Sequence, residues 1–191
     1  MKKYISILIS IFIFLGAKAA SPEEHISFMG MPVAGSDELF VQHLIDKGFV
    51  KTGTFESTTS LYGKFANEIV ELTVLASPRT KTVCKVIVYF PAKSSWSDLK
   101  EDYFSKKRLY RSKYLLDKDF EFFSGDYEDG DGYEMRAVIN DKCNYCSFFN
   151  EPGGHITVEI CPRKQVKVTY EDSINIQVAK QELEFDAYED I

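Results

Sequence analysis

The side chains in this sequence that are best suited to chemistry are four cysteine thiols. They are Cys84, Cys143, Cys146 and Cys161. In an oxidising compartment an even number of cysteines indicates disulfides, and four cysteines allow three pairings. Because the turn residues 152–154 fold the chain back on itself, we predict that Cys143 or Cys146 bonds to Cys161 across a hairpin. The other pair would include Cys84, which also suits a free buried thiol.

The segment from Cys143 to Cys146 also matches the C-x-x-C pattern of redox proteins. A redox pair needs a helix N-terminus to lower the pKa of the attacking thiol. Residues 147–150 instead indicate a strand that enters a turn, so the redox interpretation is weak. A zinc site with His155 and Cys161 is the other alternative, but the spacing matches no standard finger. We favour structural disulfides and expect neither a metal nor a cofactor.

An acidic, glycine-rich segment at residues 125–132 resembles a calcium loop in composition only. If Gly132 is placed at the sixth position of an EF-hand loop, the first position is Tyr127 and the twelfth is Val138. Neither residue has the carboxylate that the position needs. We therefore interpret the segment as a solvated loop.

Familiar catalytic patterns are absent from the sequence. The histidines have no H-E-x-x-H spacing, no serine lies in a G-x-S-x-G elbow, and no glycine-rich phosphate loop is present. The three histidines are His25, His43 and His155. We therefore assign no catalytic residue and expect a non-enzymatic protein. The alternative is a secreted or periplasmic hydrolase-type enzyme whose site is assembled from residues scattered along the chain.

A basic cluster stands out in an otherwise acidic chain. It comprises Lys106, Lys107, Arg108 and Arg111, followed by Lys113 and Lys118. The first four residues could form an interaction surface for an anionic partner. The alternative, which we prefer, is a solvated helix face whose positive charge complements the C-terminal end of the helix dipole.

The N-terminus indicates export. Residues 1–3 are positively charged, residues 4–16 form an apolar run, and residues 17–19 form an A-x-A cleavage site. The run is shorter than the roughly 20 residues that a membrane span needs, so we predict a cleaved signal peptide over residues 1–19 rather than an anchor. The mature chain from Ala20 then has 20 basic and 29 acidic residues, a net charge of −9. The signal peptide predicts the periplasm or the cell exterior as the location. A mature chain this acidic is a poor partner for nucleic acid.

A strand followed directly by a helix is predicted to carry Cys84 and the basic cluster. Residues 81–91 alternate with a period of two and predict a central strand with one apolar face. Ser94 and Ser95 are helix-capping candidates, and Asp98 completes an imperfect capping box. The helix is therefore predicted to begin near Trp96. Its inward stripe is Trp96, Leu99, Tyr103, Tyr110 and Tyr114.

The other segments predict two similar halves within a single domain over residues 20–191. The first half (26–91) has a possible edge strand at 26–29, a helix over 37–47 and strands at 49–55, 61–66, 69–76 and 81–91. The second half (94–170) has the long helix and strands at 132–140, 142–150, 155–161 and 165–170. The tail 171–191 suits either a helix or a strand. We therefore predict an α+β fold in which two helix-plus-four-strand units share one antiparallel sheet, with the helices on one face.

The signal peptide, the lead-in Phe28-Met29-Gly30-Met31-Pro32-Val33-Ala34-Gly35-Ser36 and the helix-then-strands order over 26–170 support a resemblance. The chain resembles small exported proteins of unassigned activity from Gram-negative anaerobes. Their repeated helix-plus-sheet organisation is similar to that of TATA-binding-protein-like folds and of beta-lactamase inhibitor proteins. The likeness is one of fold and transfers no functional residue. From the features above we predict an exported, disulfide-containing, non-enzymatic binding or protein-interaction module, with an unknown protein or cell-envelope ligand as its partner.

Overall fold

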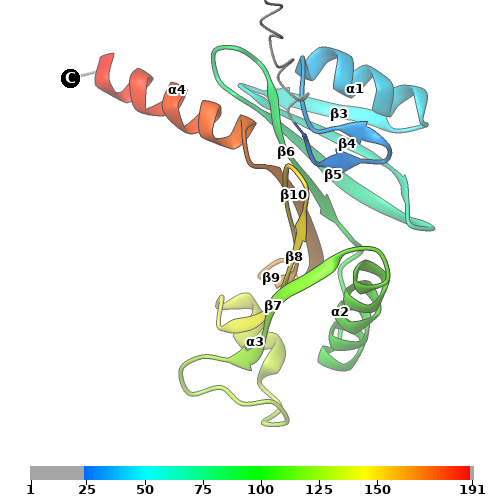
Figure 1. The fold of residues 1–191 in the computed structure, drawn as a ribbon. Helices are drawn as coiled ribbons and strands as arrows, with labels where there is room; N and C mark the ends of the chain where they lie inside the picture. Colours follow the sequence, from blue (N-terminus) through cyan, green and yellow to red (C-terminus); the bar gives the residue numbers. More distant parts are fainter. Residues whose placement is uncertain (1–23, 190–191) are drawn as a thin grey trace, which may run out of the picture.

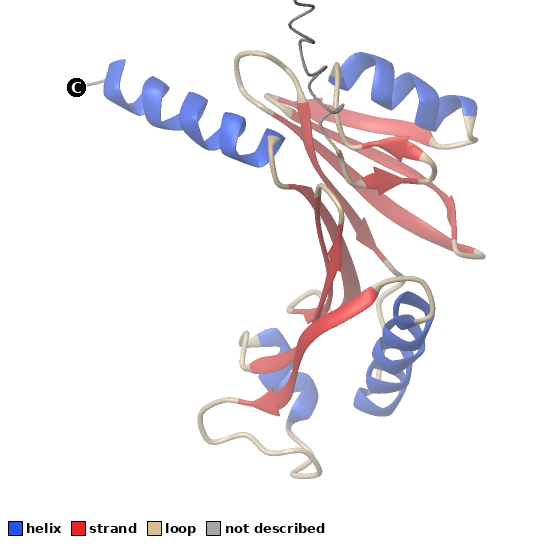
Figure 2. Ribbon diagram, in the orientation of Figure 1, coloured by secondary structure: helices blue, strands red, loops and turns tan. Residues whose placement is uncertain are grey.

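The computed structural model describes residues 24–189 and has an α+β fold built on an eight-stranded antiparallel sheet (Figures 1 and 2). The strand order is β3-β4-β5-β6-β10-β9-β8-β7. These strands are β3 (Val50–Phe55), β4 (Thr58–Phe65), β5 (Glu68–Ala76), β6 (Val83–Tyr89), β7 (Leu115–Phe123), β8 (Cys143–Glu151), β9 (Gly154–Cys161) and β10 (Gln165–Asp172). The helices are α1 (Asp37–Asp46), α2 (Trp96–Arg111), α3 (Glu134–Ile139) and α4 (Asn175–Glu189).

The N-terminal strands form a small sheet of their own. They are β1 (Ser27–Phe28) and β2 (Met31–Pro32), which pair antiparallel. The edge strand expected at 26–29 is therefore short and does not join the large sheet. The predicted signal peptide over residues 1–19 lies outside the described residues.

Strand β6 has the central position that its sequence predicts. It pairs with β5 on one side and with β10 on the other. Val86, Val88 and Phe90 are fully buried, whereas Lys85 and Tyr89 on the other face are only partly covered. Because successive side chains of a strand point to opposite sides, the sheet has one fully buried face and one partly exposed face.

Helix α2 begins at Trp96, as predicted, because Ser95 caps it. The Ser95 hydroxyl accepts a hydrogen bond of 3.1 Å from the Asp98 backbone amide. Leu99 and Tyr103 of the predicted stripe are fully buried. The Tyr103 hydroxyl shares a 2.7 Å hydrogen bond with Ser147 on β8, which satisfies two polar groups in the core.

Helix α1 also agrees closely with the predicted range. Phe40, Val41 and Leu44 are buried, and Gly48 follows the helix with φ +95°, the left-handed conformation that commonly ends a helix. Residues of α1, α2 and the buried face of the sheet form one continuous apolar cluster.

Two predictions in the second half are wrong. The segment 132–140 does not form the expected strand, because Glu134–Ile139 is helix α3. Ala137 and Val138 are adjacent and both buried, which suits a helix face and not the alternation of a strand. The fourth strand of this half is instead Leu115–Phe123, strand β7, which the sequence pattern did not reveal.

The tail from residue 171 first completes β10 and then forms α4, which projects away from the sheet (Figure 1). Asp172 and Asn175 anchor its first turn, as described below. Farther along, the Arg79 side chain binds Asp186 at 2.6 Å and lies 4.2 Å from the centre of the Phe185 ring. Over residues 24–189, no helix is both long enough and apolar enough to cross a membrane.

Candidate functional site

The four cysteines are free thiols in the structure, so the predicted disulfides are not formed. Cys146 pairs with Glu159 in the β8–β9 ladder, and Cys161 lies two residues farther along β9. Diagonal neighbours of this kind are about 7–8 Å apart, beyond the Cα separation of about 7 Å that a disulfide spans. Cys143 packs against the core and therefore faces the opposite side of the sheet from Cys146.

The thiols also lack the environment of a redox site. The C-x-x-C segment begins strand β8 and does not precede a helix. Burial raises the pKa of both the Cys143 and the Cys146 thiol to about 12, and that of Cys84 to about 11. These groups therefore stay protonated at physiological pH and are weak nucleophiles and metal ligands. Within residues 24–189, no three metal-ligating side chains come together.

The predicted basic cluster on α2 is divided by the fold. Lys106 binds Glu68 at 2.5 Å and Asp102 at 2.8 Å, and Lys107 binds Asp119 and Glu121. Both lysine side chains are largely buried. Arg108 and Arg111 are exposed, so the interaction surface stays a prediction for these two residues alone.

The ion pairs of Lys107 explain the unusual orientation of strand β7. Burial lowers the pKa of Lys107, but the hydrogen bonds to Asp119 and Glu121 outweigh this effect and raise it above the usual value. The two acids point toward α2, so the alternating Phe120 and Phe122 point to the other face of the sheet. Their exposed fractions are 46% and 50%.

The face of the sheet opposite the apolar cluster, here called the open face, can be traced across six strands. One row of paired residues on it is Glu71, Tyr89, Lys167, Glu159, Cys146 and Phe120. An aromatic triad of Phe120, Phe122 and Phe148 lies at one end of this face. The centre of the Phe120 ring is 6.4 Å from that of Phe122 and 6.3 Å from that of Phe148. Lys118 lies 5.1 Å from the centre of the Phe148 ring.

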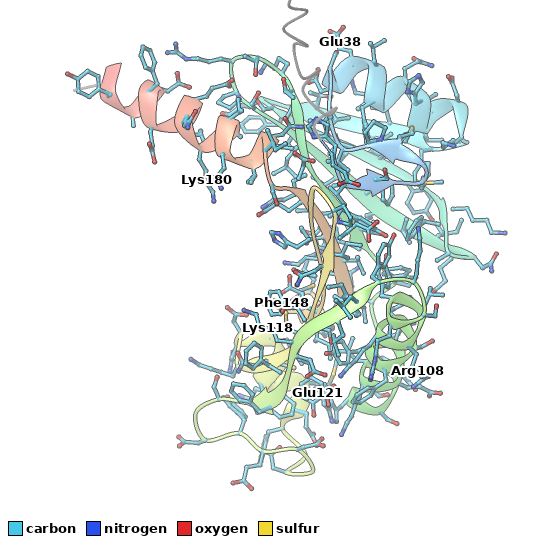
Figure 3. All side chains as sticks on the ribbon, viewed as in Figure 1. Glu38, Arg108, Lys118, Glu121, Phe148 and Lys180 are labelled. Atoms are coloured by element: carbon cyan, nitrogen blue, oxygen red, sulfur yellow. The ribbon has the colours of Figure 1, made fainter. Side chains whose placement is uncertain are left out.

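A shallow groove of about 680 Å³ adjoins this triad, and Cys146, Cys161 and the Lys167–Glu159 ion pair also line it. Figure 3 shows Phe148 and Lys118 pointing away from α2 into the concave side of the molecule. Lys180 of α4 points toward the same side. The open face is therefore concave and partly aromatic, and projecting elements frame it.

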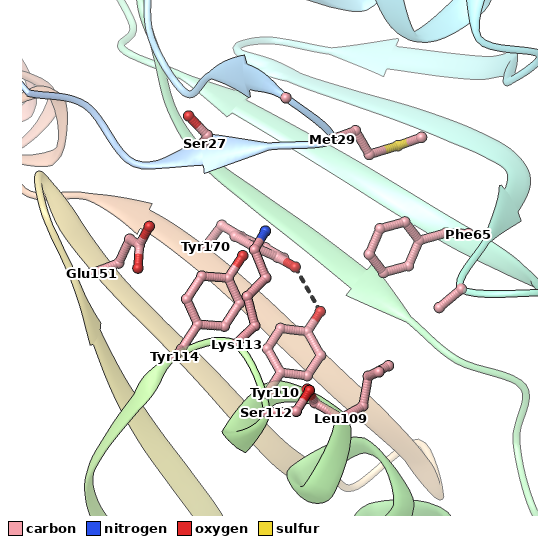
Figure 4. A pocket seen from close by; sticks show the side chains of 12 residues that line it. Ser27, Met29, Phe65, Leu109, Tyr110, Ser112, Lys113, Tyr114, Glu151 and Tyr170 are labelled. Atoms are coloured by element: carbon pink, nitrogen blue, oxygen red, sulfur yellow. Dashed lines mark hydrogen bonds between the residues drawn. The ribbon is translucent and has the colours of Figure 1, made fainter.

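A second, smaller pocket lies on the other side of the sheet, between β1, the end of α2 and β10 (Figure 4). We call it the tyrosine pocket. Its volume is about 360 Å³, and the residues that line it include Tyr110, Tyr114, Tyr170, Phe65 and Met29. The Tyr110 and Tyr170 hydroxyls share a 2.6 Å hydrogen bond, and burial raises the pKa of both groups well above the usual value.

The histidines do not form a catalytic constellation. His25 Nδ1 lies 2.9 Å from Asp172, a fully buried carboxylate that also accepts hydrogen bonds from the backbone amides of Ile26, Ile174 and Asn175. His155 lies 3.5 Å from Glu171, and His43 is an exposed residue of α1. Among residues 24–189, neither pair has a hydrogen-bonded serine or cysteine, so neither histidine activates a nucleophile of this kind.

Comparisons of the chain with family models, with curated proteins and with solved structures found no match. Any functional conclusion must therefore come from the two surfaces described above.

Sequence reasoning predicts neither surface. Tyr110 and Tyr114 belong to the predicted inward stripe of α2, but Phe65 and Tyr170 come from distant strands that only the folded sheet brings close. The available signal for the open face is the alternation of Phe120 and Phe122 with acidic residues, which indicates a strand with one apolar face.

Proposed function

We propose that this protein is an exported, non-enzymatic binding module that engages a protein partner through the open face of its sheet. The observation that carries the proposal is the orientation of β7. Its acids are directed inward to Lys107, and its two phenylalanines are left about half exposed beside Phe148. Apolar groups exposed together, with polar groups around them, are typical of interaction sites.

The groups around the triad define the chemistry of the partner. Phe120, Phe122 and Phe148 favour apolar side chains, and Lys118 beside Phe148 favours a carboxylate. We therefore propose a protein segment that presents apolar side chains next to an acidic one. A cell-envelope protein would meet both requirements. Nothing in either surface favours the alternative of a hydrolase-type enzyme.

Site-specific photocrosslinking in the source cell tests this proposal. A photoreactive phenylalanine analogue is placed at Phe122 and, as a matched control, at Phe55 on the opposite edge strand β3, where the side chain is 76% exposed. We expect one discrete crosslinked protein from position 122 and none from position 55. The product should disappear in a Phe120→Ser, Phe148→Ser background. Equal labelling at both positions, or no product at position 122, would refute the proposed surface.

Export is a separate part of the proposal, supported by the sequence of residues 1–19. Mass spectrometry of protein recovered from the source cell should give an N-terminus at or near Ala20, in the periplasmic or extracellular fraction. A protein that keeps Met1 and stays with the membrane would contradict cleavage.

We also infer that the fold consists of two helix-plus-four-strand units, α1 with β3–β6 and α2 with β7–β10. The strand order supports this inference because it is symmetric about the β6–β10 pair. In Figure 1, α1 and α2 lie on the same side of the sheet, whereas α3 is an insertion and α4 an extension. The resemblance to small exported proteins with this organisation stays a proposal.

A further inference from the structure

We propose that the tyrosine pocket binds a free α-amino acid with an apolar, preferably aromatic, side chain. This site is distinct from the open face and does not depend on the function proposed for it. The pocket has a polar end and an apolar end, and two opposite charges line the polar end without forming an ion pair with each other. These features match a small zwitterion with an apolar tail.

The charges belong to Lys113, two residues past the end of α2, and to Glu151, the last residue of β8. The Lys113 ammonium lies 4.8 Å from the centre of the Tyr114 ring, and its hydrogen bond with Tyr114 raises its pKa above the usual value, with a smaller contribution from the charge of Glu151. The Glu151 carboxylate has no hydrogen bond or ion pair with any of residues 24–189. One pocket therefore offers a cation for a ligand carboxylate and an anion for a ligand ammonium.

The apolar end is formed by Met29, Phe65 and Leu109. Figure 4 shows Glu151 and Ser27 toward one end of the pocket and Phe65 at the other, with the tyrosines between them. Methionine and aromatic side chains form adaptable, apolar walls. A volume of about 360 Å³ is at the lower end of the range for small-molecule sites, which suits a single amino acid better than a larger ligand.

The tyrosine pair supplies a further polar contact. Tyr110 and Tyr170 are each 4% exposed, and one hydroxyl donates its hydrogen to the other. The second hydroxyl hydrogen has no acceptor among residues 24–189. A buried donor of this kind is costly unless a ligand or water accepts its hydrogen bond. A ligand carboxylate held by Lys113 would be a suitable acceptor.

Isothermal titration calorimetry with three probes tests the proposal. The probes are L-phenylalanine, N-acetyl-L-phenylalanine, which lacks the ammonium, and L-phenylalaninamide, which lacks the carboxylate. Because each probe without a charge loses a charge-assisted hydrogen bond, we expect the full-length mature protein to bind L-phenylalanine about tenfold more tightly than either analogue.

Charge-neutral variants assign each contact. Glu151→Gln should abolish the preference over N-acetyl-L-phenylalanine, and Lys113→Gln should abolish the preference over L-phenylalaninamide. Arg111→Gln, an exposed change on α2 outside the pocket, should leave all three affinities unchanged. All three positions lie at the surface, so unchanged thermal unfolding should confirm that the variants are folded.

Three results would overturn the proposal. They are no heat of binding for L-phenylalanine at millimolar concentration, equal affinities for the three probes, and a preference that neither Lys113→Gln nor Glu151→Gln alters. None of these results bears on the open face, because the photocrosslinking test uses different residues.

Discussion

At the residue scale, Asp172 and Asn175 together connect three parts of the chain that are distant in sequence: residues 25–33, Val83 and the junction of β10 with α4. Its buried carboxylate accepts hydrogen bonds from the backbone amide of Ile26 near the N-terminus and from those of Ile174 and Asn175 at the start of α4. The Asn175 side chain donates in turn to the carbonyls of Val33 and Val83. Together these contacts satisfy backbone groups that would otherwise be buried without partners.

Replacing Asp172 should therefore be severely destabilising. We expect Asp172→Ala to lower the free energy of unfolding by about 3 kcal/mol or more, because several buried amides lose a charged acceptor. The exposed Asp126 has no such contacts, and Asp126→Ala should stay within about 0.5 kcal/mol. Urea unfolding followed by circular dichroism measures both. Similar small effects would show that the carboxylate is dispensable.

Glycine provides a second test at this scale, in the β8–β9 turn. Gly153 has φ +79°, and a Cβ atom built on it would lie 2.1 Å from the Glu24 carbonyl oxygen. Gly153→Ala should cost about 2 kcal/mol or more, because left-handed strain and a backbone clash act together. Gly53 has open space and no left-handed strain, so Gly53→Ala should change the melting temperature little. Equal melting temperatures for the two variants would contradict the close approach of the N-terminal segment.

At the element scale, the elements predicted best from the sequence are those whose apolar residues recur with the period of a strand or a helix and face the core. The strand at 83–89 and the helix from Trp96 are placed correctly because their buried faces are apolar and their ends have clear signals, such as Ser95. Strand β7 is missed because its inward residues are the acids Asp119 and Glu121, which only the distant Lys107 makes tolerable. Inward charges on an edge strand also discourage pairing with other chains.

The dependence of β7 on Lys107 can be measured. Lys107→Met leaves Asp119 and Glu121 without their partner, and it should destabilise the protein by about 1–2 kcal/mol, since both acids are partly exposed and screened. Amide hydrogen exchange over residues 118–123 should accelerate more than exchange in β6. Arg108→Met is the matched control, because the neighbouring Arg108 is exposed. If the Lys107→Met variant shows unchanged exchange in β7, the strand is held by its ladder alone.

At the scale of the whole molecule, the two units proposed above, α1 with β3–β6 and α2 with β7–β10, meet at the β6–β10 pair. Val88 and Val168 are directly opposite each other in this pair, and both are fully buried. Lys106 adds a second connection, since it binds Glu68 of the first unit from helix α2 of the second. The sequence predicts the elements of the first unit but misses β7 in the second. It does not predict this junction, because the contacts across it join residues about 40 to 80 positions apart. The tyrosine pocket lies at the same junction and could not be predicted for the same reason.

A continuous core predicts that the two units unfold together. Trp96, the single tryptophan, lies in the second unit against Phe123 and Tyr145 and reports its unfolding by fluorescence. Leu72→Ala in the first unit removes a fully buried side chain and should cost about 2–5 kcal/mol. In urea, the Trp96 signal and the far-UV circular dichroism should shift to the same lower midpoint. Val50→Ala, at a side chain that is 65% exposed, should shift neither signal appreciably. A Trp96 midpoint that Leu72→Ala leaves unchanged would show that the units fold independently, because the buried β6–β10 pair would then transmit no stability between them.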